Sequence, residues 1–360
     1  MRVPLFATDH DRYTPALRER VSGVIDSGRF ILGPEVEGFE NEFADYLGAG
    51  HCIGVANGTD AITIALRAMG VEPGDEVVMP SFTFYATAEA AVNAGATPVF
   101  CDVDPDTFCI TPETAQAAVT PRTRAIIAVH LFGNVAPVPE LLELGLPVLE
   151  DAAQAAGATL NGVKAGALGT AATFSFFPSK NLYCLGDGGA IVTNDPDVAA
   201  RVRRLRFHGS EDKQTFVDVG YNSRLDALQA GALRVLLPEL DGWNAARRRA
   251  ARQYEEKGLG NAVTLPTPVD GADPVYHLYM VRSERADELA ASLEAAGIEA
   301  RSYYRVPVHL QSPMVRYGGP SLDLPGTELA ARENLALPMG SELSEEAVSE
   351  VVDACQSVFA

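Results

Sequence analysis

The chain has 360 residues, of which 47% are hydrophobic, and its 48 acidic and 28 basic residues give a formal net charge of −20. A chain of this length can bury a large core, as one two-lobed unit or as a large domain plus a smaller one. The acidic surplus argues against nucleic acid or an anionic membrane as a partner, because both are bound by basic surfaces. An anionic ligand would need local donors such as arginines or helix N-termini.

The five cysteines are odd in number and show no CxxC spacing. This usage favours a reducing compartment over a disulfide framework or a zinc site, and no metal site is predicted. The N-terminal MRVPLFATDHDRY lacks the apolar core of a signal peptide, and no segment approaches the roughly 20 apolar residues of a membrane span. We therefore expect a cytoplasmic protein that does not bind a membrane.

In chain order, a helix that begins at Pro34 comes first, and strand-like and helical patterns then alternate between about residues 50 and 195. One of the intervening helices is expected over 60–70. The expected strands are 51–56, 75–80, 97–103, 124–131, 146–151, 172–177 and 190–194. Alternation with short links predicts an α/β fold with a mostly parallel sheet covered on both faces.

The next stretch, 223–258, reads as a long helix that Pro238 should kink or break, which would place a hinge between two lobes. It is followed by the remaining expected elements, a strand at 275–282, a helix at 285–297, an extended run at 303–309 and a final helix at 344–359. We predict a large domain over 1–240, including the N-terminal segment, and a smaller C-terminal α+β domain over 241–360.

Ligands of parallel α/β sheets gather at the carboxyl ends of the strands. Gly58 and Thr59, in Asn57-Gly58-Thr59-Asp60, follow the first strand and open a helix, so they are candidates for a phosphate cradle. A plain N-cap turn is the alternative. Asp151 ends a later strand, with Gln154 just beyond it. It is expected either to cap the next helix or to pair with a protonated ring nitrogen.

Lys180 lies in TFSFFPSKNLYCLGDGGA and is one of only four lysines in the chain. A lysine is protonated at neutral pH unless desolvation lowers its pKa or imine formation removes its charge. The neighbouring phenylalanines supply an apolar environment, although a surface lysine is the alternative. An imine-forming lysine, an acid for a ring nitrogen and a phosphate cradle together indicate pyridoxal 5'-phosphate (PLP).

At these positions the sequence resembles the sugar aminotransferases of the DegT/DnrJ/EryC1/StrS family, which are PLP enzymes of fold type I. The resemblance covers nearly the whole chain. It is carried by segments such as NGTDAITIALRAMGVEPGDEVVMPSFTFYATAEA, VLEDAAQAAGA, FSFFPSKNLYCLGDGGAIVT, GYNSRLDALQAG and LALPMG. The family's fold implies a large domain with a mostly parallel central sheet and a smaller C-terminal α+β domain.

The resemblance also implies roles for individual residues. Lys180 would form the aldimine with PLP and move protons, and Asp151 would keep the pyridine nitrogen protonated. The implied cofactor contacts are Gly58, Thr59, Phe84, Asp151, Gln154, Ser175, Lys180 and Asn222. Asn222 would reach the phosphate of the neighbouring subunit, so a homodimer with shared active sites is implied.

Arg224, Tyr304 and His309 match positions that handle the sugar or the amino donor. For His309, as for His130, a structural hydrogen bond is an equal alternative. The sequence departs from the family pattern at Phe132 and Asn134, where tyrosine and glutamine are common, and at Tyr183, where glycine is often found. A phenol so close to Lys180 would narrow the sugar pocket.

The resemblance implies an aminotransferase that moves an amino group from L-glutamate, through pyridoxamine phosphate, to a keto group of a nucleotide-linked deoxyhexose. The lysine context resembles members that act on 3-keto sugars, with a 4-keto sugar or a cyclitol as alternatives. A PLP-dependent sugar dehydratase is disfavoured because such relatives carry histidine in place of the lysine. A non-catalytic sensor has no need of Lys180.

Overall fold

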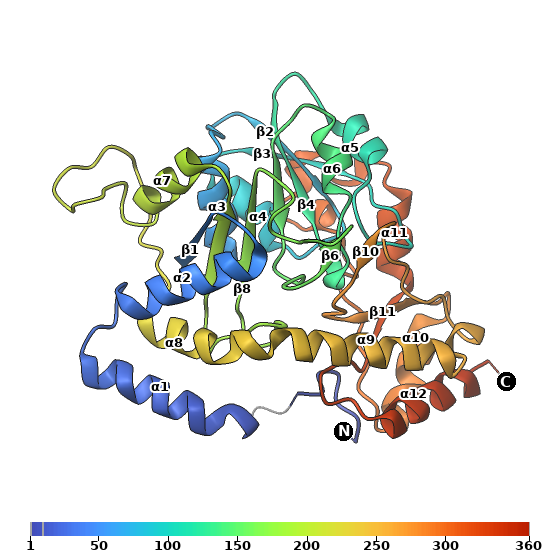
Figure 1. The fold of residues 1–360 in the computed structure, drawn as a ribbon. Helices are drawn as coiled ribbons and strands as arrows, with labels where there is room; N and C mark the ends of the chain where they lie inside the picture. The colour runs from blue at the N-terminus through green and yellow to red at the C-terminus, as the bar shows by residue number, and fades with distance from the viewer. Residues whose placement is uncertain (1, 9–10, 360) are drawn as a thin grey trace.

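The computed structural model describes residues 2–8 and 11–359, and a seven-stranded sheet forms its centre (Figure 1). The strand order is β1-β9-β8-β5-β4-β2-β3. These strands are β1 His51–Val55, β2 Glu76–Pro80, β3 Thr97–Cys101, β4 Thr123–Val129, β5 Val148–Asp151, β8 Ala171–Ser175 and β9 Gly189–Thr193. All seven predicted strands are present, with ends that differ by one or two residues, and the predicted α/β class is confirmed.

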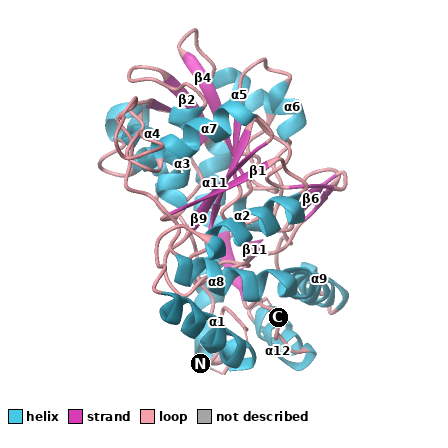
Figure 2. Cartoon of the chain, turned by 60° about the vertical axis from the view of Figure 1, so that its left-hand side comes forward, coloured by secondary structure: helices cyan, strands magenta, loops and turns pink. Residues whose placement is uncertain are grey.

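Helices lie on both faces of the sheet (Figure 2). The α-helices are α1 Thr14–Ser27, α2 Pro34–Leu47, α3 Gly58–Ala68, α4 Ala86–Asn93, α5 Pro112–Ala118, α6 Val138–Leu142, α7 Pro196–Leu205, α8 Ala227–Leu236, α9 Leu240–Glu256, α10 Ala286–Ala295, α11 Pro325–Glu333 and α12 Glu345–Ser357. Successive strand residues face opposite sides. Ile53 of β1 packs in the core beside α3, whereas Cys52 packs beside α2 and α8.

Most of the sheet is parallel, but β9 runs antiparallel to both of its neighbours. A parallel crossover usually needs a helix between the two strands. The segment 176–188, which joins β8 to β9 and carries Lys180, contains no helix and turns the chain back. Lys180 therefore lies in the link between two antiparallel strands, just beyond the carboxyl end of β8.

The helical stretch 223–258 is interrupted where Pro238 was predicted to break it. Helix α8 ends at Leu236, a 3₁₀ turn spans Leu237–Glu239, and α9 starts at Leu240. The predicted boundary between 240 and 241 thus falls at the start of α9, and it stays a prediction. The run 303–309, expected to be extended, is irregular and ends in a short 3₁₀ turn.

The C-terminal part has a core of its own, formed by α9, α10, α12 and the antiparallel pair β11 Tyr279–Arg282 and β12 Asn334–Leu337. Val3 joins this core, and it bridges to Ile298. The described residues 2–8 therefore contact the C-terminal part, although the N-terminal segment was assigned to the large domain. A small third sheet consists of β6 Thr159–Leu160, β7 Val163–Lys164 and β10 Ala272–Asp273.

Within residues 2–8 and 11–359, no helix combines the length and the apolar character needed to cross a membrane.

Phe43 of α2 offers a test of how β8, the strand that precedes Lys180, is held in place. Its ring is fully buried and contacts the rings of Phe174 and Phe176 at centroid distances of 5.0 and 5.6 Å. Phe43→Ala should lower the free energy of unfolding by about 3–5 kcal/mol, because truncation leaves a cavity. Denaturant titration measures this change. The matched control is Phe216→Ala, whose side chain is 58% exposed, and equal losses in the two variants would contradict the assignment.

Candidate active site

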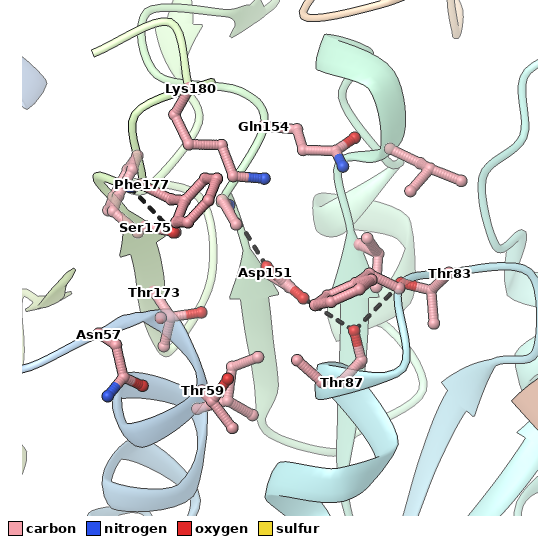
Figure 3. A pocket seen from close by; sticks show the side chains of 18 of the residues that line it. Asn57, Thr59, Thr83, Thr87, Asp151, Gln154, Thr173, Ser175, Phe177 and Lys180 are labelled. Carbon is pink, nitrogen blue, oxygen red and sulfur yellow. Dashed lines mark hydrogen bonds between the residues drawn. The ribbon is translucent and has the colours of Figure 1, made fainter. Parts of the chain in front are cut away.

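A cavity of about 730 Å³ lies at the carboxyl ends of β4, β5 and β8 (Figure 3). The sequence-predicted residues that line it are Gly58, Thr59, Phe84, Asp151, Gln154, Ser175, Lys180 and Tyr304. The structure thus brings together residues that are far apart in the chain. Their roles stay predictions. Their positions and contacts show which interactions each side chain can make.

The N-terminus of α3 forms one wall of the cavity. Asn57 caps the helix by accepting a hydrogen bond from the Asp60 N–H at 2.8 Å, which leaves the cap and the cradle as compatible roles for this turn. The first N–H groups of a helix have no intrahelical acceptor, so those of Gly58 and Thr59 can bind an anion. A Cβ at Gly58 would lie 2.8 Å from the Ser175 Cβ. Glycine is therefore required for the helix end to approach the end of β8.

Asp151 ends β5 and is 7% exposed. Its Oδ2 accepts from the Thr87 hydroxyl at 3.0 Å and its Oδ1 from the Ala153 N–H at 3.3 Å (Figure 3). Burial raises the pKa of Asp151, while Thr87, Ala153 and the charge of Lys180 oppose that rise. In the described part of the chain no cation forms an ion pair with it within 4 Å. A cationic ligand group would stabilise this carboxylate.

Lys180 follows β8 and points into the same cavity (Figure 3). Burial lowers the pKa of Lys180 to about 8, although the carboxylate of Asp151 raises it. A substantial fraction of this amine is therefore neutral near physiological pH and is available as a nucleophile or a base. The surface-lysine alternative does not fit this environment.

Aromatic rings form the opposite wall. Phe84 is 58% exposed, with its ring centroid 6.3 Å from that of Tyr304. Tyr304 stacks on Phe132 at 6.0 Å and accepts a hydrogen bond from the Gln154 Nε2 at 3.3 Å. The Gln154 Oε1 in turn accepts from the Phe132 N–H at 2.6 Å. Phe132, where the family often has tyrosine, is thus part of the support for Gln154.

Three predicted site residues lie outside this cavity. His309 is buried, and its Nδ1 shares a hydrogen bond with the Ser81 hydroxyl at 2.6 Å, so the structural alternative describes its contacts. Asn222 is exposed and accepts a hydrogen bond from Arg224, whose guanidinium lies over the Phe207 ring at 5.4 Å. The contribution of Asn222 to a partner's site, and that of Arg224 to binding the sugar or the amino donor, stay predictions.

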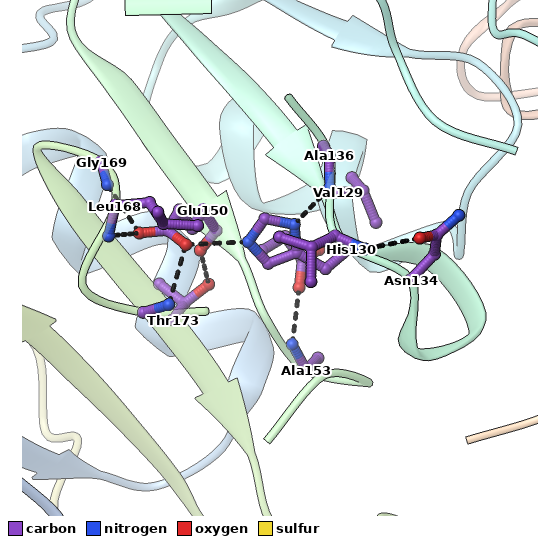
Figure 4. A network of polar contacts seen from close by, with 12 residues as sticks. Val129, His130, Asn134, Ala136, Glu150, Ala153, Leu168, Gly169 and Thr173 are labelled. Atoms are coloured by element: carbon purple, nitrogen blue, oxygen red, sulfur yellow. Dashed lines mark hydrogen bonds and ion pairs between the residues drawn. The ribbon is translucent and has the colours of Figure 1, made fainter. Parts of the chain in front are cut away.

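His130 and Asn134 also have structural contacts. The His130 Nδ1 accepts from the Ala136 N–H at 3.0 Å, so its Nε2 carries the proton and donates to Glu150 at 2.8 Å (Figure 4). Asn134 joins separate loops by donating to the carbonyls of Thr107 and Thr267. Neither residue lines the cavity beside Lys180.

Sequence reasoning missed several residues of the cavity. Thr87 holds Asp151, and its Oγ1 lies 3.1 Å from that of Thr83. Thr83 lies before α4, which begins at Ala86, so no helical spacing in the sequence marked this pair. His277 also lines the cavity, and burial lowers its pKa well below the usual value. Tyr183 stacks on Trp243 and lines a neighbouring cavity that also includes Lys180, and its effect on the sugar pocket stays a prediction.

This fold and this arrangement of side chains are those of an aminotransferase of the α/β class. The chain belongs to the DegT/DnrJ/EryC1/StrS aminotransferase family, whose model matches residues 12–356. The predictions of family, of fold type I and of an enzyme are thereby confirmed.

Two curated relatives cover nearly the whole chain. A "pleiotropic regulatory protein" from Geobacillus stearothermophilus is 47% identical over 98% of this chain and 97% of its own length. A dTDP-3-amino-3,4,6-trideoxy-alpha-D-glucose transaminase from Streptomyces venezuelae is 46% identical over 93% of this chain and 89% of its own length.

Two solved structures are similar as well. DesV from S. venezuelae, in complex with a ketimine intermediate, superposes with a TM-score of 0.95 at 43% identity, over 99% of this chain and 98% of its own. NtdA from Bacillus subtilis, with bound cofactor PMP, has a TM-score of 0.90 at 31% identity, over 98% of this chain and 83% of its own.

The lowered pKa of Lys180 predicts unusual reactivity in protein that has been treated with hydroxylamine, which releases any carbonyl compound bound to the amine, and then dialysed. Reductive methylation of Lys180 should rise with a midpoint near pH 8, because only the neutral amine reacts and its pKa is about 8. Mass spectrometry of the peptide that contains Lys180 measures the profile. Asp151→Asn should move the midpoint lower, since the Asp151 carboxylate raises this pKa. A midpoint near 10.5 would contradict the burial argument.

Proposed function

We propose that this chain is a PLP-dependent aminotransferase that transfers the amino group of L-glutamate to a 3-keto group of a nucleotide-linked deoxyhexose. The observation that carries the proposal is the convergence of Lys180, Asp151 and the N-terminus of α3 on one cavity. Nucleotide-sugar transamination is the activity of named relatives such as the Streptomyces enzyme. Glutamate and the 3-keto position are the finer parts of the proposal.

The cavity residues fit PLP at three points. Asp151 is a buried carboxylate that lacks an ion pair within the described residues, so it fits a protonated pyridine nitrogen. The free N–H groups of α3 and the Ser175 hydroxyl fit a phosphate. Phe84 presents an exposed ring that fits the face of an aromatic cofactor. When bound, PLP supplies the electron sink that stabilises a carbanion next to the transferred nitrogen.

The protein's own contribution is binding, orientation and proton transfer. Lys180 Nζ would bond to the cofactor between turnovers and, when released, would carry a proton to and from the substrate carbon. Its pKa of about 8 suits both roles near neutral pH, because acid and base forms are then both populated. Asp151, held by Thr87 and Ala153, would keep its negative charge in place throughout.

The choice of a 3-keto acceptor is supported by the lysine context SFFPSKNLYCLGDGG and by the 3-amino sugar in the name of the Streptomyces relative. A 4-keto sugar or a cyclitol is the alternative acceptor. The presence of Lys180 argues against a dehydratase. The Geobacillus relative's name points to regulation, but a regulator that binds without reacting has no use for a buried amine of lowered pKa.

A homodimer with shared sites is also part of the proposal. Asn222 matches a family position that reaches the phosphate of the neighbouring subunit, and in this chain it lies outside the cavity that contains Lys180. A second copy would therefore bring its Asn222 to the phosphate end of its partner's site.

The first test is the absorption spectrum of the purified protein with PLP. The wild type should acquire the visible band of lysine-bound cofactor, and L-glutamate should convert it to the amine form. Lys180→Ala should lack the band and lose roughly 10²- to 10⁴-fold in rate, because the proton carrier is gone. A wild type that never gains the band would refute the role of Lys180, and a band insensitive to glutamate would refute the donor.

The shared-site proposal predicts complementation between two inactive variants. Lys180→Ala and Asn222→Ala should each be inactive alone, whereas a refolded mixture should regain about a quarter of wild-type activity, because half of the dimers are mixed and each has one intact site. Steady-state assays and size-exclusion chromatography measure both quantities. A mixture that remains inactive although mixed dimers form would contradict the sharing of sites.

A further inference from the structure

A second cavity, of about 430 Å³, lies beside the first and shares part of its wall. The residues common to the two cavities are Phe6, Phe177, Ser179 and Lys180. Lys180 therefore borders two spaces. Asp151 and Thr59, two of the proposed cofactor contacts, line only the first of them.

Arg247 of α9 lines the second cavity and is 3% exposed. Its Nη1 donates to the carbonyl oxygens of Tyr276 and His277, at 3.1 and 3.4 Å, but its Nε is buried without any hydrogen-bond partner. Burial, with no opposing acid, lowers the pKa of Arg247 to about 10. A buried guanidinium with no opposite charge beside it destabilises the fold unless a ligand supplies that charge.

The chain's other buried arginine shows what is missing at Arg247. Arg206 donates to the carboxylate of Glu40 and to the Gly54 carbonyl. No carboxylate of the described residues pairs with Arg247 in this way. In a chain of net charge −20, a buried arginine left without an acid indicates that the acid arrives with a ligand.

The wall of the second cavity has the character of an anion site. Two cations, Lys180 and Arg247, face a space whose remaining polar lining comes from hydroxyl and amide side chains such as Ser179, Asn181 and Ser341. Among residues 2–8 and 11–359, no aspartate or glutamate contributes to this wall. A guanidinium binds a carboxylate through charge-assisted hydrogen bonds, which are stronger than those between neutral groups.

We propose that Arg247 binds a carboxylate of the amino donor while the donor's amine reacts beside Lys180. This inference rests on the proposed function, and it adds the residue that recognises the donor. An amino acid carries its carboxylates a few bonds from the reacting amine, so an anion site next to Lys180 is within its reach. The diphosphate of a nucleotide sugar is separated from carbon 3 by the sugar ring and is the competing source of anionic oxygen.

Variants of Arg247 test the proposal in the holoenzyme. Arg247→Gln should raise the glutamate concentration for half-maximal rate of the first half-reaction roughly 10- to 100-fold, because a charged hydrogen-bonded contact is lost. Arg247→Lys, which keeps the charge but not the fork, should lose less. The KM for the nucleotide sugar should stay unchanged. Stopped-flow spectroscopy of the cofactor band gives the first quantity, and steady-state assays give the second.

Arg248→Gln is the matched control. Arg248 lies on the same helix and ties it to the same loop, with Nε donating to the Pro274 carbonyl at 2.9 Å and Nη2 to the Asp273 carbonyl at 3.2 Å. It does not line the second cavity. If the effect of Arg247 came only from holding this loop, Arg248→Gln would raise the glutamate requirement as well, and the proposal would be overturned.

Calorimetry with glutarate, a dicarboxylate that has no amine to react, supplies a readout apart from turnover. Wild type and Arg248→Gln should bind it equally, and Arg247→Lys should bind it more weakly, which keeps the test open if Arg247→Gln does not fold. Equal binding by the Arg247 variants, or a raised KM for the sugar alone, would overturn the proposal. A wild type that binds glutarate but does not transaminate glutamate would instead refute the proposed donor.

Discussion

The site depends on one buried charge, the carboxylate of Asp151 at the end of β5. Burial reduces its contact with water and raises its pKa. The protein supplies two hydrogen bonds, from Thr87 and from the Ala153 N–H, and the distant charge of Lys180. These are too few partners for a fully buried anion. A cationic ring nitrogen would complete the set, so the carboxylate and its ligand would stabilise each other's charged forms.

The strand that carries Asp151 also anchors the opposite face of the sheet. Side chains alternate along a strand, so Glu150 points away from the cavity. It is fully buried, and its oxygens accept from the N–H groups of Gly166, Leu168 and Gly169 and from His130 (Figure 4). This complete set of donors fixes β5 against the loop before β8. Asp151 pairs in register with Thr173 of β8. The hydrogen bonds to Glu150 therefore also help to fix the distance from Asp151 to the segment that bears Lys180.

Much of this arrangement could be predicted from the sequence because it depends on local sequence patterns. Apolar runs predicted the seven strands, and polar residues that follow those runs marked Lys180, Asp151 and the turn at Gly58 as candidates. Contacts that form between distant segments have no such pattern: Thr87 reaches Asp151 across 64 positions. In the sequence, Arg247 is one of several arginines on a polar helix. Only the packing of α9 in the structure distinguishes it from the others. The side of Lys180 on which Tyr183 lies is likewise not defined by its proximity in sequence, because it depends on packing against Trp243.

Two cavities around one lysine suit a reaction that takes its substrates in turn. In a ping-pong transfer, the amino donor and the keto acceptor both react at the same atom of the cofactor, so a single pocket would have to recognise a small dianion and a large nucleotide sugar. Dividing the contacts relieves this conflict. The first cavity can keep the volume that the sugar needs, while Arg247 offers the donor a charge complement in a neighbouring space. Lys180 borders both cavities, so its amine is positioned to serve each half-reaction.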